Sequence, residues 1–264
     1  DGIRDVAVTG VQTCALPISV EGYRFCLVLR GADLHDGLTE TDPQREGHHP
    51  LPVTARRPAA ERAATLVNEW IRLAGERIKD EKPANMVLLR GFANLPAIPP
   101  MHEVYNMRTA GIAIYPMYRG LAKLAGMTVY PGGHDIHEEV EKAKSLWDQY
   151  DFFYIHFKNA DSAGEDGDFA RKAKALELLD TAIPAIRALN PDVLMVSGDH
   201  STPSTLKAHS WHPVPFMLRA PWCYPDDVRA FNERACRQGE LGRFPAADVM
   251  PLAMAYAMKL AKYG

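Results

Sequence analysis

The sequence predicts an α/β fold with two domains, and three observations support this prediction. Short apolar and β-branched runs alternate along the chain with longer stretches of helical period, a rhythm typical of an α/β layer. The 264 residues, 47% of them hydrophobic and 24% charged, can bury a sizeable core. Acidic residues and histidines gather directly after several predicted strands, where open α/β sheets carry their ligand sites.

Composition excludes several classes of function. A formal net charge of -3 gives no basic field for nucleic acid or for anionic lipid. The four cysteines are scattered without a C-x-x-C pair, so neither a disulfide scaffold nor a zinc knuckle is indicated, and a reducing cytoplasm fits. No apolar run reaches membrane-spanning length, and the first twenty residues do not match a signal peptide. We therefore expect a cytoplasmic protein without nucleic-acid or membrane partners.

The opening stretch VTGVQTCALPIS, residues 8–19, shows neither the period of a strand nor that of a helix. It resembles the conceptual translation of a sequencing-library adapter, and residues 1–19 are interpreted as an artefact. The alternative is an ordinary surface extension with turns near Gly10 and Pro17. On the first interpretation, native sequence begins near Val20 and an amino-terminal segment is missing.

The first half of the chain contains three predicted strands and one helix. A short β-branched run predicts a strand at 23–30, and the polar, Pro- and His-rich residues 33–60 predict a long functional loop. Apolar residues recur on one helical face over 61–79, which indicates an amphipathic helix laid on a sheet. Two further strands are predicted within 85–91 and 110–116, each ended by Gly or Pro.

The second half repeats this rhythm with stronger signals. Asp135 and Glu138 form a capping box that opens a helix continuing toward Trp147. Pro184 is expected to kink or split a later helix. The remaining predicted elements are strands at 152–157, 193–196 and 214–218 and helices at 169–189 and 247–262.

Two loops that follow these strands carry the candidate metal ligands. Glycines in the first loop permit a tight turn that aims its side chains inward. Carboxylates mixed with imidazoles favour Mn, Zn, Co or Mg over calcium, and the number of ligands allows two ions. The candidates are Asp161, Glu165, Asp166 and Asp168 in the first loop and Asp199, His200, His209 and His212 in or after the second.

Some of these residues also have simpler structural interpretations. The first loop lacks the alternating Asp or Asn, the sixth Gly and the twelfth Glu of an EF-hand. Asp166 and Asp168 are expected to be turn and helix-cap residues, because Asp often precedes a helix. His212 fits a structural role as well as a catalytic one, and His156 inside an apolar strand fits a satisfied core histidine. The pair Asp199–His200 alone could form a hydrogen-bonded turn, but it lies in GDHSTP beside a second acidic loop.

Longer stretches carry a family resemblance. They are YIHFKNADSAGEDGDFARKAKALELLD, VSGDHSTPSTLKAHSWHPVPFML and FNERACRQGELGRF. In these stretches the chain resembles the archaeal type of cofactor-independent phosphoglycerate mutase, with its bacterial relatives, within the alkaline phosphatase superfamily. This resemblance extends to YRFCLVLRGADLHDGLTETDPQ, PANMVLLRG and YRGLAKLAGM, which are similar to that family's substrate-binding insert. The resemblance implies an incomplete alkaline-phosphatase-like three-layer domain at 128–264 and a partial α/β insert domain at 20–127.

The resemblance also implies two divalent metal ions, with Mn expected and Mg, Co or Zn as alternatives. The family's first metal site falls on Asp161, Glu165 and His209, where Glu165 stands in place of the usual His. This departure bears on metal preference more than on metal binding, since a carboxylate still binds Mn or Mg. The second site falls on Asp199 and His200, together with an amino-terminal Asp and a nucleophilic Ser that have no counterpart here.

The activity implied by the resemblance is interconversion of 2-phosphoglycerate and 3-phosphoglycerate through a phosphoserine. Arg90 and Arg119 are expected to hold the carboxylate and phosphate of the substrate, with Arg30, Asp42 and Lys158 as secondary contacts. Solvated surface charge is the alternative interpretation of Arg30. Because the nucleophilic Ser is missing, the chain as given is expected to be inactive. Two alternatives remain: another metal-dependent phosphotransferase or phosphohydrolase on this scaffold, or a non-catalytic metal-binding fragment.

Overall fold

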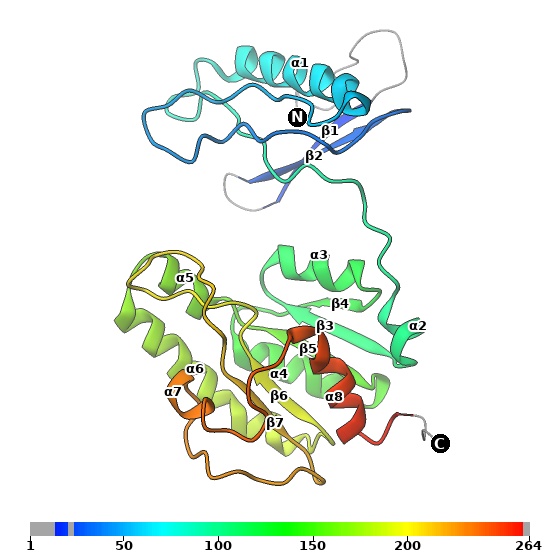
Figure 1. Cartoon of the computed structure of the whole chain (residues 1–264), viewed down its shortest axis with the longest axis vertical. Helices are drawn as coiled ribbons and strands as arrows, with labels where there is room; N and C mark the ends of the chain where they lie inside the picture. Colours follow the sequence, from blue (N-terminus) through cyan, green and yellow to red (C-terminus); the bar gives the residue numbers. More distant parts are fainter. Residues whose placement is uncertain (1–13, 21–23, 261–264) are drawn as a thin grey trace. The chain divides into compact units, whose positions relative to one another are not determined.

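The structure, a computed structural model, describes residues 14–20 and 24–260 and forms two compact units (Figure 1). The amino-terminal unit ends at Ile98 and the carboxy-terminal unit begins at Pro99. This division precedes the boundary between residues 127 and 128 that the sequence predicts. The difference arises because strand β3, Thr109–Ala113, is hydrogen-bonded in parallel to strand β4, Thr128–Pro131, so that both belong to one sheet of the second unit.

The amino-terminal unit consists of a two-stranded sheet, one long helix and extended loops. Strand β1, Cys14–Ser19, pairs antiparallel with strand β2, Phe25–Arg30, and helix α1, Glu61–Ile78, lies against this pair (Figure 1). The rings of Phe25 and Trp70 pack 5.8 Å apart at this contact. The helix predicted at 61–79 and the strand predicted at 23–30 are therefore confirmed.

Two segments of this unit differ from the prediction. The turn expected near Pro17 on the alternative interpretation is not formed, because Pro17 lies within β1 and strand pairing overrides a weak local pattern; Gly10 lies outside the described residues. The strand expected within 85–91 is not formed either. Leu89 is instead held by Thr41, whose hydroxyl donates to the Leu89 carbonyl (3.1 Å) and accepts from the Leu89 amide (2.7 Å).

The carboxy-terminal unit is built on a parallel sheet in the order β4-β3-β5, with β5 at Phe152–His156. Helix α3, Pro116–Leu124, connects β3 to β4, and helix α4, Ile136–Ser145, connects β4 to β5. These two crossovers run in opposite directions across the sheet, so right-handed connections place their helices on opposite faces. The predicted α/β fold with a parallel sheet is thus confirmed.

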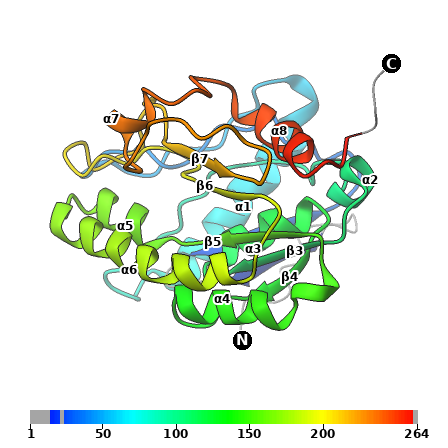
Figure 2. The same cartoon turned by 90° about the horizontal axis from the view of Figure 1, so that it is seen from below.

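The remaining elements complete this unit. The apolar core formed by Ile136, Val140 and Ala182 joins α4 and α6 to β5 (Figure 2). As predicted, Asp135 caps α4 by accepting the Glu138 amide. Pro184 does not split the later helix as one alternative expected, because α6 runs past it as one helix. The remaining elements are helices α2, Met101–Tyr105; α5, Asn159–Glu165; α6, Phe169–Ala188; α7, Glu233–Cys236; and α8, Val249–Tyr256; and the antiparallel strands β6, Leu194–Ser197, and β7, Phe216–Arg219.

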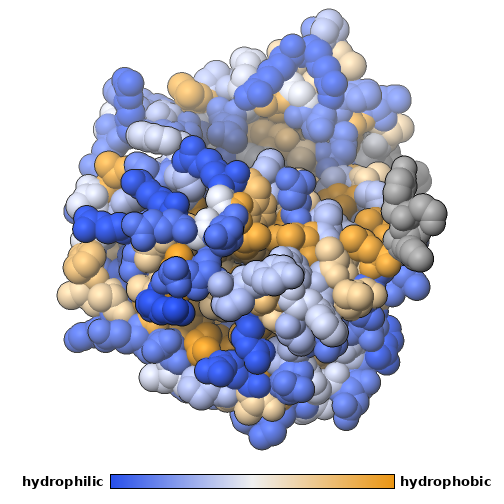
Figure 3. Space-filling view, turned by 60° about the horizontal axis from the view of Figure 1, so that its bottom comes forward, coloured by the Kyte–Doolittle hydropathy of each residue, from blue (hydrophilic) through white to orange (hydrophobic). Residues whose placement is uncertain are grey.

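The surface is mostly hydrophilic on the face drawn in Figure 3, with apolar side chains showing through in several places. Among the described residues, no helix is both long and apolar enough to cross a membrane. Strands β5 and β6 end at His156 and Ser197, and the candidate ligands follow each of these ends directly. The fold therefore presents both ligand-bearing segments at carboxyl ends of strands.

Candidate metal centre

The first ligand segment is a helix, whereas the sequence analysis predicts a loop. Asp161 and Glu165 lie four residues apart in α5, and this spacing places their side chains on the same helical face. The expected tight turn follows the helix, where Gly167 has a φ of +75°. The helix therefore supplies two carboxylates in fixed register.

The second segment is closed by a backbone bridge between Ser201 and Ser210. The Ser210 amide donates to the Ser201 carbonyl at 2.8 Å, and the two residues form an isolated antiparallel bridge. His200 and His209 each precede one of the bridged residues, and their rings lie with centroids 3.8 Å apart. The backbone bridge and the two imidazoles are therefore close neighbours.

The donor atoms of these segments have the spacing of metal ligands. His209 Nε2 lies 3.6 Å from Asp161 Oδ1 and 3.4 Å from Glu165 Oε1. Metal–ligand bonds of about 2.1 Å place neighbouring donors about 3.0 to 3.4 Å apart. Donor atoms of Asp161, His200 and His209 all lie within 4.8 Å of one another. Asp161, His200 and His209 could therefore share one divalent ion, and Glu165 lies next to this group through His209.

Asp199 lies beside this cluster, and a side chain of helix α3 orients its carboxylate. Its Oδ2 is 3.6 Å from His200 Nε2 and accepts a 3.0 Å hydrogen bond from the hydroxyl of Tyr118. Burial and the bond to Asp199 raise the pKa of Tyr118, so that its hydroxyl keeps its proton and remains a donor. The Tyr118 ring also stacks on His156 at 3.3 Å. A buried tyrosine therefore links α3 to the Asp199 loop.

His156 meets the expectation of a satisfied core histidine only in part. Burial lowers the pKa of its imidazole, which favours the neutral form. Its Nδ1 is buried without a hydrogen-bond partner among the described residues. The ring is thus held mainly by its stacking contact with Tyr118.

Lys158 contacts the same two carboxylates through their other oxygens. Its Nζ is hydrogen-bonded to Asp161 Oδ2 and lies 3.9 Å from Glu165 Oε2. Burial alone would raise the pKa of Asp161, but hydrogen bonds from Lys158 and Thr202 outweigh it and lower the pKa. The ammonium therefore holds the acids from one side and leaves Oδ1 and Oε1 facing His209.

Three further candidates lie outside the donor cluster. Asp168 caps α6 by accepting the Arg171 amide, and Asp166 is hydrogen-bonded to the Arg171 guanidinium, as expected for cap and turn residues. His212 Nδ1 lies 2.9 Å from Ser210 Oγ, and its ring stacks on Trp211. These contacts give each residue a structural role.

The predicted substrate contacts divide between the two units. Arg119 is half-buried in α3, one residue after Tyr118. Arg30 and Arg90 are exposed side chains of the amino-terminal unit, and Asp42 Oδ1 there accepts the Gln44 amide at 2.8 Å. Arg119 and Lys158 are thus the predicted contacts that share a unit with the metal ligands.

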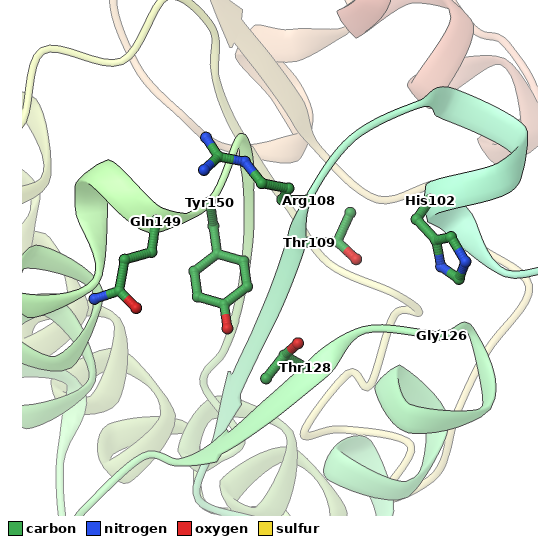
Figure 4. Close-up of a pocket in the computed structure, with 7 residues that line it drawn as sticks. All are labelled: His102, Arg108, Thr109, Gly126, Thr128, Gln149 and Tyr150. Atoms are coloured by element: carbon green, nitrogen blue, oxygen red, sulfur yellow. The ribbon is translucent and has the colours of Figure 1, made fainter.

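A cavity of about 320 Å³ lies at the opposite edge of the parallel sheet (Figure 4). Thr109 and Thr128, the first residues of β3 and β4, line it together with Tyr150, which precedes β5. Ligand sites of open α/β sheets lie instead at the carboxyl ends of the strands. This cavity is therefore distinct from the donor cluster.

Two solved structures are similar in fold. A protein from Pyrococcus horikoshii matches with a TM-score of 0.69 and 29% identity, covering 78% of this chain and 60% of the other. The cofactor-independent phosphoglycerate mutase from Thermoplasma acidophilum matches with a TM-score of 0.64 and 25% identity, covering 97% of this chain and 68% of the other. These similarities support the α/β fold assignment.

Sequence relatives agree with this likeness. Probable 2,3-bisphosphoglycerate-independent phosphoglycerate mutases from Thermus thermophilus and Thermotoga maritima are 48% and 46% identical to the chain. The matches cover 92% of this chain and 60% of each relative, so the chain spans about three fifths of their length. The Metalloenzyme superfamily model matches residues 47–256, which include all the candidate metal ligands. The chain therefore belongs to the metalloenzyme superfamily.

Proposed function

We propose that this chain is part of a metal-dependent phosphoglycerate mutase that interconverts 2-phosphoglycerate and 3-phosphoglycerate without a bisphosphoglycerate cofactor. The observation that carries the proposal is the convergence of Asp161, His200 and His209 donor atoms within 4.8 Å, on a chain 48% identical to probable mutases. The free thiols of Cys26, Cys223 and Cys236 accord with a reducing compartment, and we propose a cytoplasmic location.

The donor set fits two divalent ions, with manganese as the proposed metal. Asp161, Glu165 and His209 would hold the first ion, and Asp199 and His200 would contribute to the second. Mixed carboxylate and imidazole donors suit Mn, and the same atoms accept Mg, Co or Zn. When bound, such ions stabilise negative charge on transferring phosphoryl oxygens. The nucleophile is proposed to be a Ser outside this sequence.

The protein's own cations are proposed to hold the substrate. Arg119 and Arg90 would each bind a carboxylate or phosphate in bidentate fashion, with Arg30, Asp42 and Lys158 in supporting contacts. We propose that substrate binding is concentrated in residues 20–127 and metal binding in residues 128–264, as the resemblance implies. Arg119 and Tyr118 in α3 would then join the two functions.

The decisive experiment is a coupled assay of 3-phosphoglycerate conversion with added Mn²⁺. It compares this chain with a chimera that carries the amino-terminal part of the Thermus thermophilus relative in place of residues 1–19. Activity in the chimera alone would support the mutase and the proposed external nucleophile. Activity in neither protein would overturn the mutase, and activity in this chain would overturn the external nucleophile.

The metal assignment has its own test in the isolated chain. Asp161→Asn should weaken Mn²⁺ binding in a calorimetric titration by at least tenfold, because it removes a charged donor. Asp166→Asn is the matched control, since Asp166 pairs with Arg171 outside the cluster. Equal affinities in the two variants would contradict the assigned site. Titrations with Mn²⁺, Mg²⁺, Co²⁺ and Zn²⁺ would rank the metals, and Glu165→His would show whether this residue sets the ranking.

A second candidate is a metal-dependent phosphohydrolase or another phosphotransferase on the same scaffold. The observation that favours it is Glu165, which adds a negative charge 3.4 Å from His209 Nε2. Release of inorganic phosphate faster than 2-phosphoglycerate formation in the chimera would support this candidate. Quantitative conversion to 2-phosphoglycerate without phosphate release would exclude it.

A further inference from the structure

Thr202 lies between two candidate ligands that belong to different segments. Its hydroxyl oxygen is 2.5 Å from Asp161 Oδ1 in α5 and 3.0 Å from Nδ1 of His200, in its own loop. Only 4% of Thr202 is exposed to solvent, so water does not compete strongly for either contact. Sequence analysis assigned this residue no role.

The hydrogen bonds of this hydroxyl have a fixed direction. A threonine hydroxyl carries one proton, and an ionised carboxylate can only accept. The Thr202 proton must therefore point to Asp161, because two acceptors 2.5 Å apart without a proton would repel each other. The contact with His200 is then a hydrogen bond only if His200 Nδ1 carries a proton and donates it. In a neutral imidazole this leaves the lone pair on Nε2.

We propose that Thr202 is a positioning residue that fixes His200 in the Nδ1–H tautomer and thereby makes Nε2 its metal-binding atom. The same hydroxyl anchors Asp161 Oδ1, so one side chain sets the orientation of a ligand from each segment. This inference rests on the proposed metal site but not on the identity of the phosphorylated substrate.

The surroundings of His200 Nε2 agree with this assignment. Nε2 lies 3.6 Å from Asp199 Oδ2, which is too long for a direct hydrogen bond. In the Nδ1–H tautomer, a lone pair on Nε2 and a carboxylate oxygen face each other with no proton between them. A cation placed between these two acceptor atoms could bind both of them.

Thr202 is itself held firmly. Its carbonyl accepts a 2.6 Å hydrogen bond from Lys172 Nζ in α6. The carbonyl also packs against Gly164 of α5, where an added Cβ would lie only 2.4 Å away. Threonine is β-branched and stiff at χ1, so a fixed backbone also fixes the direction of its hydroxyl. Serine would keep the hydrogen bonds with less restraint.

The first test reads the tautomer directly in the metal-free chain. Long-range ¹H–¹⁵N correlation spectra of the histidine rings distinguish a protonated Nδ1 from a protonated Nε2. We expect the Nδ1–H pattern for His200 in the natural sequence and in Thr202→Ser, and a mixture of tautomers in Thr202→Val. An Nε2–H pattern in the natural sequence would overturn the inference without any variant.

The second test measures Mn²⁺ affinity by calorimetry, using Mn²⁺ alone. Loss of a residue that orients a metal-binding histidine commonly weakens metal affinity 10- to 100-fold. We expect that loss in Thr202→Val, a change within a few fold in Thr202→Ser, and no change in Thr205→Val, an exposed threonine of the same loop. An unchanged affinity in a folded Thr202→Val protein would overturn the inference. If the tautomer and affinities follow expectation while the chimera lacks mutase activity, the proposed function fails and the role of Thr202 stands.

Discussion

The hydroxyl of Tyr118 donates a 3.0 Å hydrogen bond to Asp199 Oδ2, which ties helix α3 to the loop that follows β6. Tyr118→Phe keeps the ring that stacks on His156 and removes the donor alone. We expect unfolding free energy to fall by about 1 kcal/mol. Mn²⁺ affinity should also fall, because Asp199 loses its orientation.

The matched control is Tyr130→Phe, which removes a hydroxyl that lies 2.6 Å from the hydroxyl of Tyr150. Urea unfolding should show a comparable loss of stability in both variants, whereas calorimetry should show weaker Mn²⁺ binding in Tyr118→Phe alone. The same Mn²⁺ affinity in both variants would mean that Tyr118 stabilises the fold without orienting Asp199.

Gly164 is predicted to be intolerant of a side chain. An added Cβ would lie 2.4 Å from the Thr202 carbonyl oxygen, a backbone atom that cannot move aside cheaply. Gly164→Ala should lower the free energy of unfolding by about 1–3 kcal/mol through overpacking. Gly120→Ala, at a helical position with nothing within 4 Å, should instead raise it by about 0.5–1 kcal/mol. Urea denaturation of both variants checks the opposite signs.

Glu139 is predicted to make the free energy of unfolding depend on pH between about pH 4.5 and pH 8. Burial raises the pKa of this carboxyl to about 8, against an ordinary value of 4.5, although the Ile114 amide donates to it. Between these values the folded protein binds a proton that the unfolded chain releases, so the free energy of unfolding falls as pH rises. The slope approaches about 1.4 kcal/mol per pH unit.

Glu139→Gln should flatten this slope, because an amide stays neutral at every pH. Thermal unfolding between pH 5 and pH 8 would show the natural sequence losing stability faster than the variant. Glu141→Gln, at an exposed position of the same helix, should keep the natural slope. If the stability of both proteins changed with pH at the same rate, the prediction that Glu139 is neutral in the folded protein would be wrong.

Asp151 is predicted to stabilise the first strand of the parallel sheet in an acid-sensitive way. Its carboxylate accepts the backbone amide of Arg108 and two bonds from the Arg108 guanidinium, and these contacts lower its pKa to about 2. The stabilisation is present above the ordinary value of 3.8 and disappears as pH falls toward 2. Asp151→Asn should therefore lower the free energy of unfolding by about 1 kcal/mol at pH 7.

The difference in unfolding free energy between Asp151→Asn and the unsubstituted protein should become steadily smaller below pH 4. Urea unfolding at pH 7, 4 and 3 measures it, with Asp148→Asn at a nearby exposed position as control. A difference that does not change with pH would show that the carboxylate charge is unimportant there.

Most regular elements could be predicted because local pattern and tertiary context agree. The amphipathic face of α1 and the Asp135 cap of α4 are examples of signals that lie within one element. Strand β1 could not be predicted from residues 14–19 alone, because it forms by pairing with β2, which lies outside that stretch. The structure divides into compact units after Ile98 for the same reason, since parallel pairing of β3 with β4 cannot be read from either strand alone.

The sequence names candidate ligands and predicts that the two segments carrying them converge, but it does not predict the contacts that orient their side chains. Asp161 and Glu165 were expected in a turn, and their common direction comes from the helical spacing of α5. Thr202 and Tyr118 were missed because an ordinary threonine or tyrosine gives no sequence signal for its partner. Their roles depend on contacts to Asp161 and Asp199, which lie 41 and 81 positions away along the chain.

The Ser201–Ser210 bridge also has a use in protein engineering. It fastens the base of the loop between two backbone atoms, next to His200 and His209 and away from the tip. Thr205 and Leu206 at that tip are exposed. Exposed loop tips with fastened ends tolerate insertions well. A fluorophore or short affinity tag introduced there would report on metal loading from within a few residues of the ligands while leaving their spacing intact.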